Sequence, residues 1–261
     1  MALLERVDRG AVAHLTMMSP KNLNALSNGM LAALQSQFDA LANDPSIRVI
    51  VLKGDGKAFC AGHDLKEMTQ ARGDADGGAA KFADLFARCS AMMQTILRLP
   101  QPVIAQVHGI AAAAGCQLVA TCDLAVAAEG TTFGVNGVNI GLFCSTPMVA
   151  LSRNIPRKQA FEMLTTGDFI PADRAVDLGL INKTAPIDQL ENTTSELAEQ
   201  IASKLGYAVK VGKRAFYDQL QMPLSDAYDF TGKVIVDNML HRDTEEGINA
   251  FIEKRAPNWE Q

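Results

Sequence analysis

The sequence has no cluster of positive charge and no hydrophobic run of the length that a membrane helix needs. Its 24 Lys and Arg residues are outnumbered by 29 Asp and Glu residues, which gives a formal net charge of -5. Proteins that bind nucleic acids normally carry a basic patch, so that class of function is disfavoured. No stretch approaches about 18 uninterrupted apolar residues. The start, MALLERVDRG, brings in Glu5 and Asp8 early and does not look like a secretion signal, so we expect a cytoplasmic protein.

Motifs for bound metals and nucleotides are missing as well. There is no GxxxxGK[ST] loop, no HExxH and no paired CxxC, and GDG at 54–56 lacks the further glycines of a dinucleotide site. The odd number and the spacing of the cysteines favour buried, reduced thiols. We therefore predict no tightly bound cofactor and no metal site. The scattered histidines are His14, His63, His108 and His241, and the cysteines are Cys60, Cys89, Cys116, Cys122 and Cys144.

Strand and helix patterns alternate along the chain up to about residue 185. From Ser27, which is a suitable N-cap, apolar residues recur at helical spacing, and the pattern is helical again from about residue 187. This order predicts an α/β fold, with a core at 1–185 and a helical C-terminal region at 186–261 that packs on the core or on a neighbouring subunit. The expected strands include 11–17, 47–53 and 123–128, and the expected helices include 80–98, 113–121, 146–153, 157–165, 172–178, 201–205, 209–220 and 224–240.

Two loops follow predicted strands and offer backbone that a ligand could approach closely. They are AFCAGHDLKEM at 58–68 and VHGIAAAAGCQL at 107–118, and the second leads into a helix N-terminus. A helix N-terminus leaves N–H groups free and carries a positive dipole. Two such N–H groups aimed at one carbonyl oxygen would form an oxyanion hole.

Five segments, in this order, resemble the crotonase superfamily, the enoyl-CoA hydratase/isomerase family. The resemblance covers nearly the whole chain and implies a spiral of ββα turns with a helical C-terminal region that packs trimers, often paired into hexamers. It also implies acyl-coenzyme A thioesters as ligands, and lyase or isomerase chemistry in fatty acid metabolism. The matching segments are KNLNALS, IRVIVLKGDGKAFCAGHDLKEM, PVIAQVHGIAAAAGCQLVATCDLAVAAEGTTFG, TGDFIPADRAVDLGLIN and GINAFIEKRAPNW.

The resemblance places the oxyanion hole at the backbone N–H groups of His63 and Ala114. The loop at 21–24 resembles the one that lies along the pantetheine and adenine, and Lys66 matches a position near the nucleotide end, where a cation suits phosphate. A solvated surface lysine remains the alternative for Lys66, and Lys254 and Arg255 are further candidates. The residues expected to bind the CoA ester are Lys21, Leu23, His63, Asp64, Leu65, Lys66 and Ala114.

The sequence departs from the family at the two positions that normally carry catalytic glutamates. Hydratases of the family use this pair to hold water and to exchange its proton with the substrate carbon. The first position, in GCELA of the family, is Gln117 here, and the second, in FGxPE, is Gly137. Gln117 can orient water but has no proton to exchange at neutral pH, and it could instead serve only as a local capping partner. Since one positioned acid or base contributes about 10²–10⁴-fold, ordinary hydration is predicted to be weak or absent.

Three functions therefore stay open. The first is an acyl-CoA-binding member of the family that polarises the thioester carbonyl. The second is decarboxylation of a malonyl-type CoA ester, because AGHD and the later VNxG resemble the methylmalonyl-CoA decarboxylases of the superfamily and loss of CO₂ needs no base. The third is a non-catalytic CoA-ester binding protein. His63 has either a side-chain role or a role through its backbone alone.

Overall fold

The main sheet of the protein has six strands, in the order β1-β2-β3-β4-β6-β9. The computed structural model describes residues 2–260. Strand β1 is antiparallel to β2, and the pairs that follow are parallel, so the carboxyl ends of β2 to β9 lie at one edge of the sheet. These strands are β1 (Leu4–Arg9), β2 (Val12–Met17), β3 (Val49–Gly54), β4 (Val103–Val107), β6 (Leu124–Ala128) and β9 (Lys183–Ala185).

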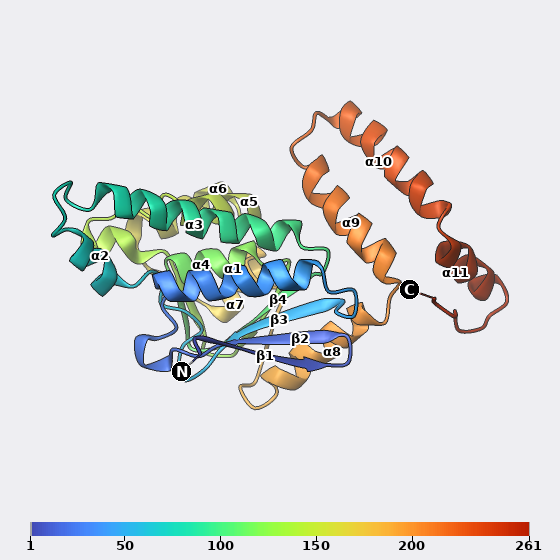
Figure 1. Cartoon of the computed structure of the whole chain (residues 1–261), viewed down its shortest axis with the longest axis horizontal. Helices are drawn as coiled ribbons and strands as arrows, with labels where there is room; N and C mark the ends of the chain where they lie inside the picture. Colours follow the sequence, from blue (N-terminus) through green and yellow to red (C-terminus); the bar gives the residue numbers. More distant parts are fainter. Residues whose placement is uncertain (1, 261) are drawn as a thin grey trace.

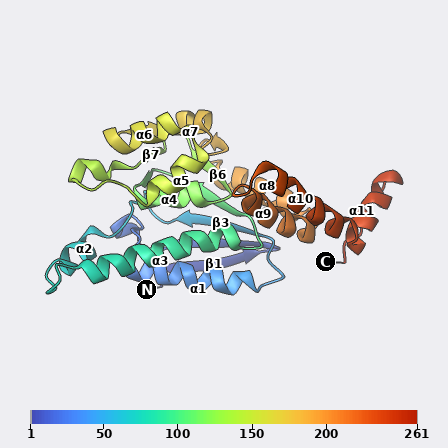
Figure 2. The ribbon, with the colours of Figure 1, turned by 90° about the horizontal axis from the view of Figure 1, so that it is seen from above.

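A second, smaller sheet has the order β5-β7-β8 and lies beside the loops that build the site. Its strands are β5 (Ile110–Ala112), β7 (Thr132–Gly134) and β8 (Phe169–Pro171). The helices between the strands are η1 (Pro20–Asn22), α1 (Asn28–Ala42), α2 (Leu65–Ala71), α3 (Ala79–Arg98), α4 (Ala114–Thr121), η2 (Asn136–Ile140), α5 (Pro147–Asn154), α6 (Arg157–Thr166), α7 (Ala172–Leu178) and α8 (Leu190–Ala202). Figures 1 and 2 show α1 and α3 side by side over the main sheet.

Helices cover both faces of the main sheet. On one face, α1 begins as predicted: the Ser27 side chain accepts a hydrogen bond from the Met30 N–H at 3.2 Å. The apolar side chains of α1 then face inward at helical spacing, with Phe38 among the fully buried ones. On the other face, Leu190 and Ala198 of α8 pack against a patch of β-branched residues. That patch consists of Val12, Val49, Val51, Ile104 and Val126.

The last three helices leave this core as an arm, which we define as α9 (Gly206–Gln219), α10 (Leu224–Met239) and α11 (Arg242–Ile252). Figure 1 shows the arm extending away from the sheet. A buried ion pair fixes its first helix, because the Lys213 ammonium lies 2.6 Å from an Asp123 carboxylate oxygen and donates to the Ile96 and Gln101 carbonyls. The Tyr217 hydroxyl donates to the same carboxylate at 2.8 Å.

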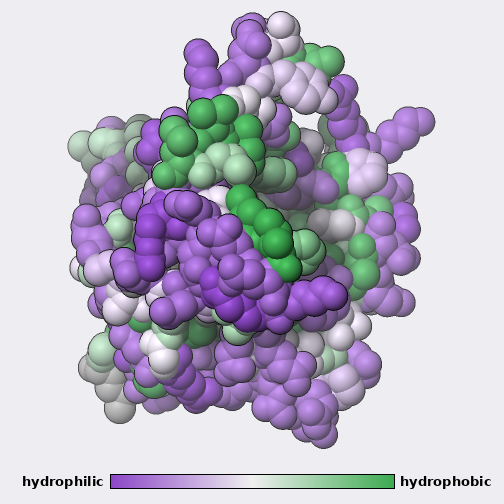
Figure 3. Space-filling view, turned by 90° about the vertical axis from the view of Figure 1, so that its right-hand side faces the viewer, coloured by the Kyte–Doolittle hydropathy of each residue, from purple (hydrophilic) through white to green (hydrophobic). Residues whose placement is uncertain are grey.

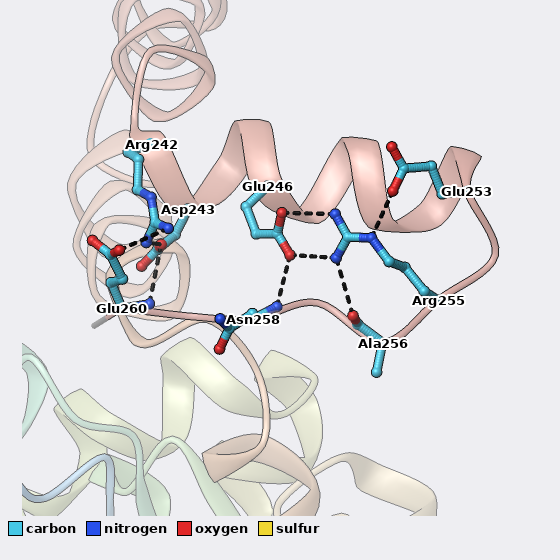
Figure 4. Close-up of polar contacts among 8 residues, drawn as sticks. All are labelled: Arg242, Asp243, Glu246, Glu253, Arg255, Ala256, Asn258 and Glu260. Atoms are coloured by element: carbon cyan, nitrogen blue, oxygen red, sulfur yellow. Dashed lines mark hydrogen bonds and ion pairs between the residues drawn. The ribbon is translucent and has the colours of Figure 1, made fainter.

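The outer part of the arm is held by charges on its own surface. Arg255 donates to both Glu246 oxygens and to Glu253, and the Asn258 N–H donates to Glu246, so the tail lies back along α11 (Figure 4). These bonds lower the pKa of Glu246 to about 2. Figure 3 views the molecule from the side of the arm and shows apolar patches between polar ones. Large exposed apolar side chains of the arm include Leu224, Tyr228, Ile235, Val236, Met239, Leu240, Phe251 and Ile252.

Several sequence predictions need correction at this level. The segment after Asp64 forms α2, which the sequence pattern did not predict; the Asp64 side chain accepts from the Lys66 and Glu67 N–H groups and caps it. The helix expected over 201–205 is instead the end of α8 and the break before Gly206. The five cysteines are free and buried, as expected. Between residues 2 and 260 no helix is both long and apolar enough to cross a bilayer.

Candidate active site

The two loops singled out by the sequence lie against each other. Cys60 forms a parallel bridge with Ala111, and the Ala112 N–H donates to the Cys60 carbonyl at 2.9 Å. Gly115 is needed for this approach, because a Cβ atom there would lie 2.2 Å from the Cys60 carbonyl oxygen. The loop at 20–26 closes the group on its other side, where the Ala61 N–H donates to the Leu23 carbonyl at 3.0 Å.

The contact brings the backbone of His63 close to that of Ala114. Between them, Gly62 has φ +94°, and a Cβ atom on it would lie 3.4 Å from the Ala114 nitrogen. Ala114 is the first residue of α4, and Ala113 before it has the strained angle φ 48°, while its N–H donates to the Gly134 carbonyl at 2.8 Å. Neither the His63 nor the Ala114 N–H has an acceptor in the described part of the chain. Two unpaired donors side by side are what an oxyanion hole requires.

These residues open onto a cavity of about 490 Å³ with a mainly apolar wall. Met68 of α2 and Phe86 of α3 form one part of it, and residues of the 136–147 segment form another. Phe86 and Leu142 line the cavity, whereas their neighbours Leu85, which is buried in the core, and Phe82, which contacts Arg72, do not. The lining residues are Ala61, His63, Leu65, Met68, Phe86, Ile110, Ala112, Ala113, Ala114, Asn136, Gly137, Ile140, Leu142, Phe143, Cys144, Ser145, Thr146, Pro147 and Phe169.

The imidazole of His63 is held within this wall. Its Nδ1 lies 3.3 Å from the Leu26 carbonyl oxygen, and its ring meets Phe86 edge-on with centroids 5.4 Å apart. Nε2 is buried and has no partner among the residues of the structure. Burial lowers the pKa of His63 below its ordinary value, because the charged form loses its hydration.

The two glutamate positions of the family look different from each other. Gln117 is 5% exposed in the first turns of α4, and its Oε1 is buried with no described partner. Gln117 does not appear in the cavity wall, whereas Gly137 does. A Cβ atom on Gly137 would lie 2.3 Å from the Leu142 carbonyl oxygen and 2.8 Å from Cys144 Sγ. No side chain therefore fits at Gly137 unless the backbone moves.

Of the seven residues predicted to bind the CoA ester, His63, Leu65 and Ala114 are in the cavity wall. Lys66 is exposed in the first turn of α2, and Asp64 is used as the cap of that helix. Lys21 is an exposed residue of η1, and Leu23 ends that turn with φ 51°. Arg255, a further candidate, lies in the arm, where its guanidinium is bound by Glu246 and Glu253. Lys254 beside it has φ 56°.

Two other acidic side chains, Asp123 and Asp168, do not supply a catalytic carboxylate to the cavity. Asp123 is occupied by Lys213, Tyr217 and the Val103 N–H, so it ties the arm to the core. Asp168 is exposed at the end of α6 and is absent from the cavity wall. Nowhere in residues 2–260 do three His, Cys, Asp or Glu side chains gather in a way that could hold a metal ion.

Sequence reasoning missed several wall residues, among them Met68, Phe143 and Phe169. Met68 lies on α2, and the capping pattern of Asp64 with Glu67 three residues later could have revealed that helix. Phe169 begins the three-residue strand β8, which is too short to leave a periodic pattern.

Comparison with known proteins identifies the family of the chain. Residues 8–261 match the model of the family described as "Enoyl-CoA hydratase/isomerase". The chain is 47% identical over 250 residues to human "Enoyl-CoA hydratase domain-containing protein 3, mitochondrial", covering 95% of this chain and 80% of that protein. An enoyl-CoA hydratase crystal structure from Mycobacterium smegmatis has 50% identity and a TM-score of 0.95, covering 99% of both chains.

The comparison corrects one prediction and settles the family. A rat relative is 45% identical over 248 residues, covering 95% of this chain and 81% of that protein. Both the human and the rat relative are named as mitochondrial, which overturns the expectation of a cytoplasmic location. The α/β fold matches that of the crotonase structures, as predicted. The chain therefore belongs to the enoyl-CoA hydratase/isomerase family.

Proposed function

We propose that the cavity binds an acyl-CoA thioester and polarises its carbonyl through the N–H groups of His63 and Ala114. The observation that carries this proposal is the pair of unpaired N–H groups at the mouth of an apolar cavity of about 490 Å³. Each preorganised donor of this kind is worth about 3 kcal/mol to a developing oxyanion. The exposed Lys66 and Lys21 would meet the phosphates of the ligand.

Calorimetric titration with butyryl-CoA, octanoyl-CoA and free CoA tests the proposal. We expect both thioesters to bind, and octanoyl-CoA to bind more tightly because the wall is apolar. Failure of both thioesters to bind would contradict the proposal.

Ordinary hydration is expected to be weak or absent. The amide of Gln117 cannot act as a general acid or base at neutral pH, and Gly137 has no room for a side chain. Turnover of crotonyl-CoA, followed by loss of the enoyl absorbance, would therefore be slow even where binding is measurable. A rate equal to that of an ordinary hydratase, measured side by side, would overturn this expectation.

Decarboxylation of a malonyl-type CoA ester is a second candidate. The cavity wall, as far as the structure describes it, includes no Lys, Arg, Asp or Glu, so a free carboxylate bound there would lack a charged partner. Such desolvation favours loss of the carboxylate as CO₂, and the electron pair left behind would be stabilised in the oxyanion hole. Incubation with methylmalonyl-CoA and ethylmalonyl-CoA, followed by mass spectrometry, tests it. Unchanged substrates would remove these two compounds.

A non-catalytic CoA-ester binding protein is the third candidate, because both acid positions lack a carboxylate. It predicts binding by calorimetry with no product from crotonyl-CoA or from the malonyl-type esters. The three candidates are thus separated by one binding measurement and two product measurements.

We propose that the protein forms a homotrimer or a hexamer, as the family resemblance implies, with the arm packed against another subunit. The support is its row of exposed apolar side chains, such as Leu240 at 80% and Phe251 at 85% exposure, which would be stabilised against another subunit. Light scattering coupled to size-exclusion chromatography tests this assembly, and a monomer at micromolar concentration would exclude it.

A further inference from the structure

The loop at 19–26 holds the short stretch of backbone that carries the His63 N–H, one of the two unpaired donors. Leu26 of this loop forms a parallel bridge with His63. In the described chain, both backbone–backbone hydrogen bonds of residues 61–63 go to the same loop, so the direction of the His63 N–H depends on where the loop lies. These two bonds run from the Ala61 N–H to the Leu23 carbonyl at 3.0 Å and from the Leu26 N–H to the Gly62 carbonyl at 2.7 Å.

Asn24 lies at the bend of this loop and is completely buried. Its φ of 52° falls in the left-handed region, which asparagine tolerates better than most residues. Both polar atoms of its side-chain amide are hydrogen-bonded to backbone. Oδ1 accepts from the Ser19 N–H at 2.9 Å, and Nδ2 donates at 2.8 Å to both the Asp55 and the Ala58 carbonyl. One side chain thus joins the start of its own loop to the segment that leads from β3 to His63.

The amide of Asn24 fits a space that the backbone leaves for it. A Cβ atom on Gly54 would lie 2.6 Å from Asn24 Nδ2, so the glycine makes room for the side chain. Without the amide, two carbonyl groups and one N–H would lose their partners in the interior, and the loop would have to shift to satisfy them. Hydrogen bonds weaken steeply as the donor turns away from the acceptor, so a small shift of the loop is enough to weaken a bond from the His63 N–H.

We propose that Asn24 is a positioning residue, whose amide fixes the loop at 19–26 against 55–58 so that the His63 N–H is aimed at the carbonyl of the bound acyl-CoA thioester. The Ala114 N–H belongs to α4, so loss of the Asn24 amide weakens one donor of the pair and leaves the other. This proposal rests on the proposed acyl-CoA binding.

Two ligands that differ only at the carbonyl test the proposal. Butyryl-CoA has the thioester carbonyl, and S-butyl-CoA has a CH₂ group in its place. Two hydrogen bonds to the carbonyl should make butyryl-CoA bind about tenfold more tightly than S-butyl-CoA to the wild-type protein, as measured by calorimetry. Asn24→Gly keeps the left-handed angle and removes the amide, and we expect it to reduce this preference to about threefold or less. The infrared band of the isotope-labelled carbonyl should move back toward its position for butyryl-CoA in solution.

Gln101→Ala is the matched control. Gln101 is also buried, and its amide donates to three backbone carbonyls of the 41–47 segment, outside the cavity wall. Its loss should lower the stability to urea, as the loss of the Asn24 amide does, but should leave the preference for the thioester and the infrared band unchanged.

The outcomes separate this proposal from the proposed function. An Asn24 variant that folds and keeps the full preference and the infrared band of the wild-type protein overturns the role of Asn24, and so does an equal loss in Gln101→Ala. Asn24→Ser, whose hydroxyl can keep one of the three bonds, is measured in case Asn24→Gly does not fold. If neither variant folds, Asn24 stabilises the whole core and the positioning role is overturned as well. A wild-type protein that binds neither ligand, or both equally, overturns the proposed function instead.

Discussion

The two walls of the cavity use different parts of the chain. The wall around His63 and Ala114 offers backbone N–H groups, whereas the two positions that the resemblance gives to glutamates, Gln117 outside the wall and Gly137 within it, would have to act through side chains. The first wall has the two backbone donors that the family resemblance predicts, at His63 and Ala114. Neither Gln117 nor Gly137 carries a carboxylate, and the loop leaves no room for a side chain at Gly137. A backbone function therefore survives changes of side chain that remove a side-chain function outright.

This contrast has a structural cause. The backbone donors are fixed by the fold: Gly62 and Gly115 let two loops approach, and the strained Ala113 starts α4. A glutamate needs its own rotamer, room and neighbours. Once Leu142 and Cys144 fill the space at Gly137, a single substitution does not restore the missing acid.

The largest effect is expected from a substitution that separates the two loops beside His63 and Ala114. Gly115→Ala would force a Cβ atom against the Cys60 carbonyl, and we expect it to lower the free energy of unfolding by about 3 kcal/mol and to abolish acyl-CoA binding. Urea unfolding and calorimetry measure the two effects. Gly212→Ala is the control: it lies within α9 with nothing near its Cβ position, so it should be neutral or stabilise by about 0.5–1 kcal/mol. Equal behaviour of the two variants would contradict the close approach.

The next effect tests Gln117, the first of the two positions that the resemblance gives to glutamates. Gln117→Glu returns one carboxylate, and we expect crotonyl-CoA hydration to rise about 10²-fold, equivalent to about 2.7 kcal/mol of barrier. Gln117→Ala, which has no acid either, should show no gain. If Gln117→Glu binds acyl-CoA normally but hydrates crotonyl-CoA no faster, the missing carboxylate at this position does not limit the hydration rate.

A smaller effect is expected at the second position. Gly137→Ala should lower the free energy of unfolding by about 1–2 kcal/mol, since the new methyl group meets the Leu142 carbonyl and Cys144 Sγ. Acyl-CoA binding through the other wall should be largely retained. Circular dichroism during urea unfolding gives the first quantity and calorimetry the second. A fully stable Gly137→Ala variant would show that the loop has room for a side chain after all.

The smallest effect concerns pH. Burial lowers the pKa of His63 and of His14 in the folded protein, so the unfolded chain binds more protons between these lowered values and about 6.5. The free energy of unfolding should therefore fall as the pH drops below about 6.5 and should be insensitive to these groups above it. His63→Asn should flatten the part of this dependence that comes from His63. A pH profile that is unchanged in His63→Asn would show that the ring is not buried as a neutral base.

Much of the core was predictable because its signals are local. The Ser27 cap and the apolar spacing after it give α1, and runs of β-branched residues give β3 and β4. Strand β1, with the sequence LERVDR, was missed because an edge strand with mostly charged side chains shows no alternation. The three-residue strands of the second sheet were missed because three residues are too few to show the alternation of apolar and polar residues that marks a strand. The division of the chain at 185 and 186 stays a prediction, although α8 packs on the core sheet and the arm departs after it.

By itself the sequence determined the class of fold, the family resemblance, the two loops with backbone donors and the absence of both glutamates. These follow from residue types, their periodicity and their order, which are properties of the chain before it folds. Only the tertiary structure decided that Gly137 is closed by Leu142 and Cys144, that Asp123 holds Lys213 of the arm, and that the Nε2 of His63 is left without a partner. The last two depend on segments far apart in sequence meeting at van der Waals or hydrogen-bond distance, and the first depends on the path of one irregular loop, which no periodic pattern encodes.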